Sequence, residues 1–392
     1  MLILAPTFTS DTMSLKYLST ALASLLLLQQ SAEAELLRTY FGTSRSAGIY
    51  TGVFDTDSGE LSPITLAAET NAPGFLAIHP NHRFLYATNA AFQQPTPGGV
   101  AAFRIQPNGG LSLVNQQPTS GRGTCHLNLD PGGQVLLAAN YTSGTVNAFK
   151  ILTDGSISPA VTTHQHQGAG AHPKRQKAPH PHSVLIHPYY HYAYVPDLGM
   201  DQVVIYSLEQ DRGALKRAGE ANVPGGSQGP RHMKFSLDGK HAYVLNELSL
   251  SLASYSVSGS NGQLEYIDSI SVFSADNQQA PGSMTCAEIR VHPNGQWIYT
   301  STRDLEDQGR DTLSTFKRAP DGSLSLISNT PAGVDFPRNF NIDPTGQWLI
   351  AAGQRSSTLA IFSIDPHSGM LTLHQSDIPF QGQPICVEFL GQ

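Results

Sequence analysis

Alternating apolar and polar residues form short paired runs along most of this chain. One pair, "HMKFSL" and "HAYVL" within residues 229–247, is joined at Asp238-Gly239. Alternation with a period of two predicts half-buried β-strands, and Asp-Gly between two such runs predicts a tight hairpin turn. An antiparallel hairpin with this turn would place Arg231 opposite Glu247 at its open end. The pattern therefore predicts a hairpin that carries a cation and an anion side by side.

The same hairpin pattern recurs along the chain. It occupies residues 76–89, 127–140, 184–197, 233–246, 289–302 and 340–353. A turn followed by Leu or Ile closes each unit, and it occurs seven times, at Leu61, Leu111, Ile157, Leu215, Leu264, Leu324 and Leu371. Units of four short strands that repeat every ~50 residues are typical of β-propeller blades. Seven copies predict an all-β protein, a seven-bladed β-propeller.

The two ends of the repeat region predict how the ring closes. The first unit has no complete hairpin and begins with the segment "LLRTYFGTS". The chain ends in a single apolar run, "ICVEFL". Joining this last strand to the first blade would leave no open sheet edge. We therefore expect one domain, residues 35–392, closed by its C-terminal strand. A pair of β-sandwiches would not explain the sevenfold repeat.

Residues 1–34 differ from the rest of the chain. From Met13, the segment carries Lys16, an apolar run and then Ala32-Glu33-Ala34. A cationic start, a short apolar stretch and an A-x-A site are the pattern of a secretory signal peptide. We predict a signal peptide cleaved near Ala34, with an uncleaved anchor as the alternative and with either Met1 or Met13 as the start. The mature protein is then expected to be secreted or periplasmic, without membrane contact.

Composition excludes several classes of function. The net charge of −7 argues against nucleic-acid binding. Three scattered cysteines form no zinc motif, and without a C-x-x-C-H haem motif a redox propeller is disfavoured. Residues 164–182 carry five histidines, but their spacing matches no closed metal motif and no carboxylate joins them. We expect no metal and no cofactor, and we expect this loop to fold over the channel mouth.

Aligning the hairpins on their turns predicts which side chains meet at one end of the central channel. The position of Arg231 is occupied elsewhere by Gly74, Cys125, His182, Ala287 and Arg338, and that of Glu247 by Ala90, Tyr141, Leu198, Arg303 and Gln354. The charged members come only from the third to sixth hairpins. A structural role should recur in every repeat, whereas a site need occur only once. The excess of arginine indicates an anionic ligand, because guanidinium groups bind carboxylates and phosphates through paired hydrogen bonds.

Several motifs within residues 36–392 resemble a known family. They are "HPHSV" (180–184), "GPRHMKF" (229–235), "YVLNE" (243–247), "CAEIRVHPNG" (286–295), "TSTRD" (300–304), "FPRNFNIDPTG" (336–346) and "PICVEF" (384–389). The sequence is similar to the seven-bladed propeller lactonases, which include propeller-type 6-phosphogluconolactonases and 3-carboxy-cis,cis-muconate lactonizing enzymes. The residues inferred to act in that family correspond here to His182, Arg231, Glu247 and Arg303. This chain departs from the family at Thr302, where the family usually has Asn.

The resemblance implies a lactone hydrolase of the 6-phosphogluconolactonase kind. A free glutamate titrates near ~4.3 and neighbouring arginines lower that value, so Glu247 would be a weak base at neutral pH. His182 is better matched as general base. Arg231 and Arg303 would stabilise the oxyanion.

Three further residues are expected to contact the substrate: Arg338, which would bind its anionic tail, Glu288 and His180. Glu288 lies one residue past the aligned position, so the alignment leaves open whether it faces the channel or the blade interior. The partner would be a small anionic lactone and the protein a monomer. Two alternatives remain, a cycloisomerase of the carboxymuconate lactonizing type and a non-catalytic exported propeller that binds a ligand.

Overall fold

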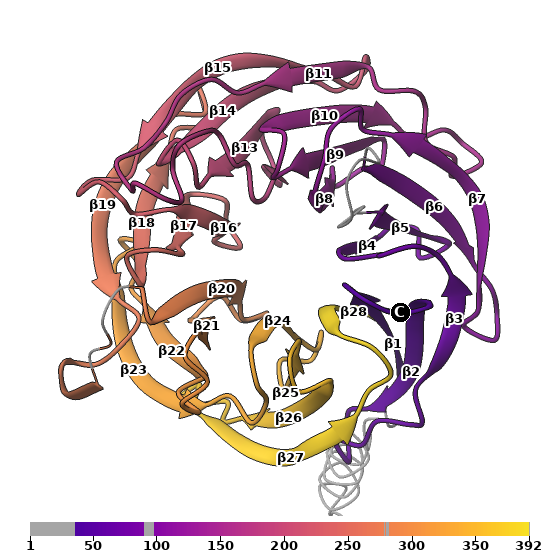
Figure 1. Ribbon diagram of the computed structural model, residues 1–392, viewed down its shortest axis with the longest axis vertical. Helices are drawn as coiled ribbons and strands as arrows, with labels where there is room; N and C mark the ends of the chain where they lie inside the picture. Colours follow the sequence, from indigo (N-terminus) through magenta and orange to yellow (C-terminus); the bar gives the residue numbers. More distant parts are fainter. Residues whose placement is uncertain (1–35, 90–97, 278, 280–281, 392) are drawn as a thin grey trace, which may run out of the picture.

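The structure, a computed structural model, describes residues 36–89, 98–277, 279 and 282–391. Residues 1–34, which carry the predicted signal peptide, lie outside the described residues. Apart from one short 3-10 turn, η1 (Ala275–Asn277), the regular elements in the described residues are all β-strands. They form seven four-stranded antiparallel sheets arranged in a ring (Figure 1). The prediction of a seven-bladed β-propeller is confirmed.

The strands follow one another from the channel outward in each blade. Blade 2 contains β4 (Leu76–Ile78), β5 (Phe84–Asn89), β6 (Gly99–Ile105) and β7 (Leu111–Pro118); blade 3 contains β8 (Thr124–Leu129), β9 (Val135–Asn140), β10 (Thr145–Lys150) and β11 (Thr162–Gln165); blade 4 contains β12 (Leu185–Ile186), β13 (Tyr192–Asp197), β14 (Gln202–Glu209) and β15 (Ala214–Asn222). Blade 5 contains β16 (Pro230–Phe235), β17 (His241–Asn246), β18 (Ser251–Val257) and β19 (Leu264–Ser271); blade 6 contains β20 (Met284–Val291), β21 (Trp297–Asp304), β22 (Thr312–Arg318) and β23 (Leu324–Pro331); blade 7 contains β24 (Pro337–Ile342), β25 (Trp348–Gly353), β26 (Thr358–Ile364) and β27 (Leu371–Pro379).

Blade 1 is assembled from both ends of the chain. The C-terminal strand β28 (Pro384–Leu390) is its innermost strand and pairs antiparallel with β1 (Leu36–Thr43), beyond which lie β2 (Gly48–Asp55) and β3 (Thr65–Glu69). In Figure 1 the yellow β28 lies beside the indigo β1. The predicted ring closure is therefore confirmed, because β28 completes the four strands of blade 1.

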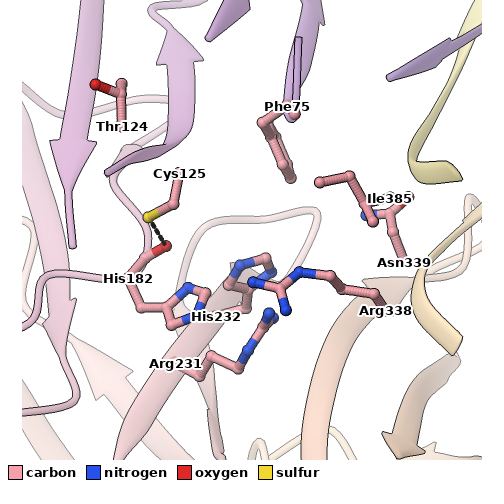
Figure 2. Close-up of a pocket in the computed structure, with 10 residues that line it drawn as sticks. Phe75, Thr124, Cys125, His182, Arg231, His232, Arg338, Asn339 and Ile385 are labelled. Atoms are coloured by element: carbon pink, nitrogen blue, oxygen red, sulfur yellow. Dashed lines mark hydrogen bonds between the residues drawn. The ribbon is translucent and has the colours of Figure 1, made fainter. Parts of the chain in front are cut away.

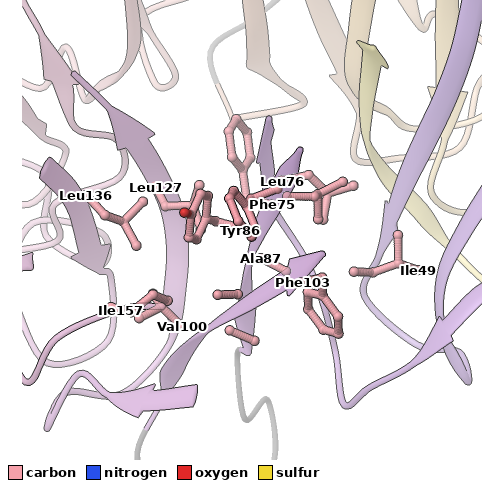
Figure 3. Packing of buried hydrophobic residues seen from close by; sticks show 14 of the residues in the cluster. Ile49, Phe75, Leu76, Tyr86, Ala87, Val100, Phe103, Leu127, Leu136 and Ile157 are labelled. Carbon is pink, nitrogen blue, oxygen red and sulfur yellow. The ribbon is translucent and has the colours of Figure 1, made fainter. Parts of the chain in front are cut away.

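Apolar side chains fill the spaces between adjacent blades. Tyr86 of β5 packs with Leu127 of β8 and Leu136 of β9 in one buried cluster, which Figure 3 shows from close by. Burying a large apolar side chain stabilises a fold by ~1.5–3 kcal/mol. Buried tyrosine hydroxyls also donate to a glycine carbonyl in a turn of the next blade, as in Tyr40 to Gly109, Tyr86 to Gly155, Tyr194 to Gly262 and Tyr299 to Gly369. Each blade is thus held to its neighbour by packing and by hydrogen bonds.

β-Bulges interrupt the inner strands at the channel mouth. In blade 5, Pro230 pairs with Asn246 and His232 with Leu245, so Arg231 is an extra residue without a backbone partner. The same shift occurs at Cys125 in blade 3 and at Arg338 in blade 7. A bulge breaks the alternation of a strand, so two consecutive side chains can face the same side. The predicted backbone pairing of Arg231 with Glu247 is therefore wrong: the bulge absorbs Arg231, and the N–H of Glu247 donates to the carbonyl of Gly229.

The described part of the chain contains no helix that is long and apolar enough to cross a membrane.

Candidate functional site

The charged side chains of the inner strands surround a pocket at one end of the channel. We call it the channel pocket; its lining residues are Gly74, Phe75, Thr124, Cys125, His182, Arg231, His232, Arg338, Asn339 and Ile385. These residues come from six of the seven blades, and Figure 2 shows the two arginines and the two histidines on one side of the pocket. The empty space among these residues, part of which is open to solvent, amounts to about 390 Å³. Three of the predicted site residues, His182, Arg231 and Arg338, border this pocket.

Glu247 is the centre of a buried ionic cluster beside the channel pocket. Its Oε2 lies 3.0 Å from Nε of Arg231 and 3.3 Å from Nη2 of Arg303, and its Oε1 lies 2.7 Å from Nη2 of Arg175. Burial raises the pKa of Glu247, but the guanidinium groups of Arg303, Arg231 and Arg175 outweigh it and lower the pKa to about 2. Glu247 is therefore ionised at neutral pH. The predicted contacts of Glu247 with Arg231 and Arg303 are confirmed.

Arg231 and Arg303 differ in how they relate to the channel pocket. Arg231 borders it, and its Nη1 donates to the carbonyl of Ala287, which fixes the plane of the guanidinium. Arg303 is not among the lining residues, because Glu247 and the carbonyl of Cys286 hold its Nη2 behind the cluster, at 3.3 and 2.9 Å. The geometry therefore favours Arg231 as a contact for an oxyanion. It does not support the same direct role for Arg303.

His182 borders the pocket as a neutral imidazole. Burial and the nearby charge of Arg231 lower its pKa well below the usual value. Its Nε2 lies 3.9 Å from Oε2 of Glu247, which exceeds hydrogen-bonding distance, and its buried Nδ1 has no partner in the described part of the chain. A neutral imidazole can accept a proton, as the predicted role of His182 as base requires, and that role stays a prediction.

Arg338 presents an uncompensated positive charge to the channel pocket. It has neither a hydrogen bond nor an ion pair with any residue that the structure describes. Burial and repulsion by Arg231 lower its pKa to about 10, which still leaves it charged at neutral pH. A partly buried guanidinium without a counter-ion favours an anionic ligand. This geometry agrees with the role predicted for Arg338.

The chain is similar to known lactonases over most of its length. The sequence profile described as "Lactonase, 7-bladed beta-propeller" matches residues 38–389. The chain belongs to this family. Among curated relatives, the 6-phosphogluconolactonase of Bacillus subtilis (strain 168) is 34% identical over 361 residues, 90% of this chain and 98% of that protein. The 6-phosphogluconolactonase of Formosa agariphila is 32% identical over 328 residues, 83% of this chain and 90% of that protein.

A solved structure supports the same family assignment. The periplasmic gluconolactonase of Pseudomonas aeruginosa superposes with a TM-score of 0.83 at 29% identity, and the match covers 91% of this chain and 99% of that one. The resemblance inferred from the motifs is confirmed. This lactonase and its relatives thus share the whole propeller.

Two residues predicted to bind substrate lie outside the pocket of this lactonase. Glu288 is fully buried; its Oε1 lies 3.0 Å from Nδ1 of His232, and its Oε2 accepts a hydrogen bond from Asn339. His180 stacks on Tyr141, with ring centroids 4.5 Å apart, and its Nδ1 lies 2.9 Å from the Tyr141 carbonyl oxygen. Neither borders the channel pocket. The assignment of direct substrate contacts to Glu288 and His180 is therefore not supported by their positions.

Two functional candidates were missed by the sequence reasoning, His232 and Arg175. His232 directly follows Arg231, and a strand without a bulge would have turned it away from the channel. Arg175 comes from the histidine-containing loop, which has no periodicity that would reveal where a side chain points. The cluster "HPKR" in a Gly- and Pro-rich loop was the available signal for a cation near the mouth.

The loop at residues 164–182 reaches the channel mouth of the lactonase, as predicted. Gln176 anchors it by donating to the Leu198 carbonyl at 2.8 Å and to Oδ1 of Asp201 at 2.9 Å. His166 is buried, and its Nδ1 lies 2.6 Å from Oδ2 of Asp197. Across the described ranges, no group of three or more His, Cys, Asp or Glu side chains is arranged to hold a metal ion. The loop instead places Arg175 in an ion pair with Glu247.

Proposed function

We propose that this protein is a lactone hydrolase that acts on a sugar lactone carrying an anionic group, as in 6-phosphogluconolactone. The observation that carries the proposal is the guanidinium of Arg338, which has no ionic partner among the described residues and borders the same pocket as Arg231 and two histidines. The names of the relatives from Bacillus subtilis, Formosa agariphila and Pseudomonas aeruginosa support a lactone as the substrate. The anionic group is inferred from the charge in the pocket.

The groups at the channel pocket match the needs of lactone hydrolysis. The reaction requires a base that takes a proton from water, donors for the oxyanion, and contacts that hold the substrate. Arg231 would stabilise the carbonyl oxygen as it gains charge, and Arg338 would bind the anionic tail. A neutral histidine would be the base, because Glu247 is held as an ionised partner of three arginines. The sequence favours His182 for that step.

The proposal predicts a preference for anionic lactones that depends on Arg338. In a pH-stat assay of the mature protein, 6-phosphogluconolactone should be hydrolysed with a higher kcat/KM than glucono-1,5-lactone. Arg338→Ala should raise KM for the phosphorylated lactone by ~10–100-fold, because a hydrogen bond to a charged group contributes ~1.5–3 kcal/mol. KM for the neutral lactone should change less than ~3-fold.

Arg355→Ala is the matched control for this assay. Arg355 also belongs to blade 7, but its Nη1 donates to the Asp304 carbonyl and it does not border the channel pocket. Arg355→Ala should leave KM unchanged for both lactones. Exhaustive chelation of the wild-type protein should leave its turnover unchanged. If no lactone in a panel of phosphorylated lactones, plain sugar lactones and muconolactones is hydrolysed by folded protein, the proposed function is wrong.

We further propose that the protein is exported and loses its first 34 residues. The charged start, apolar run and Ala32-Glu33-Ala34 pattern support it, and one relative in Pseudomonas aeruginosa is described as periplasmic. N-terminal sequencing of protein recovered outside the cytoplasm should begin near Glu35. Soluble cytoplasmic protein that retains residues 13–34 would contradict export and would favour a cytosolic phosphorylated substrate.

A further inference from the structure

Two neutral histidines border the channel pocket, and within the described residues a carboxylate orients one of them, His232. Nδ1 of His232 lies 3.0 Å from Oε1 of Glu288. The other ring nitrogen, Nε2, is buried without a partner in the described residues, and His232 lines the pocket. Figure 2 shows this ring beside Arg231 and Arg338. Nδ1 of the imidazole is therefore held by a carboxylate, whereas Nε2 has no partner among the described residues.

Glu288 is itself held rigidly in an ionised form. The backbone N–H of Ile289 donates to its Oε1 at 2.9 Å, Asn339 donates to its Oε2, and Nη2 of Arg290 lies 3.8 Å from Oε2. Burial raises the pKa of Glu288, but His232 and Arg290 outweigh it and hold that pKa well below the usual value. An ionised carboxylate accepts hydrogen bonds only. His232 must then carry its proton on Nδ1, which leaves a lone pair on Nε2.

His182 lacks an equivalent arrangement. Its Nε2 lies 3.9 Å from Glu247, too far for a hydrogen bond, and the charge of Glu247 is already compensated by Arg175, Arg231 and Arg303. Nothing in the described residues bonds to its Nδ1. No carboxylate among the described residues is within hydrogen-bonding distance to set the tautomer of His182.

We propose that His232 is the general base of the lactonase reaction and that Glu288 is the residue that positions it. The inference rests on the proposed function and names the group that handles the proton. Nε2 of His232 would take a proton from water while the water oxygen bonds to the lactone carbonyl carbon. Arg231 would stabilise the oxyanion. As the ring C–O bond breaks, the imidazolium would return the proton to the leaving oxygen, giving the open hydroxy acid.

Electrostatics around His232 are compatible with this role. The ionisable groups that face it are Glu288, Arg231, Lys234, His126 and His182. Burial lowers its pKa to about 4, with Glu288 opposing that effect and Arg231 adding to it. His232 is therefore unprotonated at neutral pH, but with this pKa it is a weak base unless its charged form is stabilised during the reaction. Glu288 would stabilise the imidazolium while it exists, as the buried carboxylate does in Asp–His pairs of hydrolases.

The test compares four glutamine variants by kcat, KM and thermal stability on a lactone that the wild type hydrolyses. His232→Gln should lower kcat by ~10²–10⁴-fold, because general base catalysis usually accelerates a reaction by this factor. KM should change little. Glu288→Gln should lower kcat by at least ~10²-fold, because an amide that donates to Nδ1 would force the proton onto Nε2. His182→Gln should have a smaller effect on kcat than either.

His126→Gln is the matched control. His126 occupies the position after the bulge in blade 3 that His232 occupies in blade 5, and the two ring centroids are 5.2 Å apart. It does not border the pocket, and it has no Nδ1 contact with a carboxylate in the described residues. Its kcat should stay within ~3-fold of the wild type. If His182→Gln abolishes turnover while His232→Gln retains it, the proposal is overturned.

A measurement on the wild type covers the case in which a variant does not fold. Long-range ¹H–¹⁵N NMR of ¹⁵N-histidine-labelled protein at pH 7 should show His232 as a neutral ring with the proton on Nδ1. The Nε2–H tautomer, or an imidazolium, would overturn the proposal even if lactone hydrolysis is confirmed. If the wild type hydrolyses no lactone, the proposed function fails first, and the two failures are distinguishable.

Discussion

Glu247→Gln is expected to lower the free energy of unfolding by ~3–5 kcal/mol, the usual effect of removing one partner from a buried ion pair. The carboxylate of Glu247 is 4% exposed and contacts three guanidinium groups, those of Arg175, Arg231 and Arg303. Without its charge these cations would repel one another in a site with little water. Urea unfolding of the wild type and of Glu247→Gln at neutral pH measures the difference between their free energies of unfolding.

The control for this prediction is Glu209→Gln. Glu209 also pairs with an arginine, Arg212, at 3.3 Å, but both side chains are largely exposed, 48% and 79%. Exposed pairs contribute ~0–1 kcal/mol, so this variant should unfold almost as the wild type does. If Glu247→Gln lowers the free energy of unfolding by less than ~1 kcal/mol, the three arginines do not depend on this carboxylate.

Arg231→Lys is expected to lower kcat by ~10²–10³-fold, about as much as Arg231→Ala, which is the usual cost of removing one oxyanion donor. The guanidinium holds Glu247 through Nε and the Ala287 carbonyl through Nη1 while it borders the channel pocket. A lysine ammonium has no planar fork and cannot make these contacts together. Steady-state kcat and KM for both variants provide the measurement.

Arg310→Lys separates this effect from the general loss of an arginine. Arg310 binds Asp304 through Nε at 3.1 Å and through Nη2 at 2.7 Å, away from the channel pocket. Arg310→Lys should lower the free energy of unfolding and leave kcat unchanged. If Arg231→Lys lowers stability but retains wild-type kcat, Arg231 is only a structural clamp at the end of the sheet, and its proposed role in the reaction is wrong.

The repeat predicted most of the architecture because a propeller is a periodic structure. Each blade is a short unit whose alternating pattern is visible locally, so seven copies of the turn could be found without knowing any long-range contact. The pairing of β28 with β1 followed from the missing strand in the first repeat. Equivalent positions of adjacent blades lie at the same depth, so the alignment also predicted that Glu247 contacts Arg303.

Two parts of the site could not be predicted from the repeat. The bulge at Arg231 adds a residue that turns His232 toward the channel, and the alternation of side chains does not reveal where a bulge falls. Arg175 lies in a loop without periodicity, and its position depends on contacts of Gln176 with Leu198 and Asp201 in blade 4. These contacts join segments more than 20 residues apart.

The sequence by itself determined the number of blades, the closure of the ring and the charged residues that the inner hairpins place at one mouth, because each depends on a pattern that repeats. The tertiary structure alone decided which of those residues reach the pocket. Arg303 is bound by Glu247 away from the pocket, Glu288 contacts His232 without lining the pocket, and Arg338 has no ionic partner in the described part of the chain. The reason is physical: burial and charge pairing are properties of neighbours in space, and strand bulges and an irregular loop bring those neighbours together.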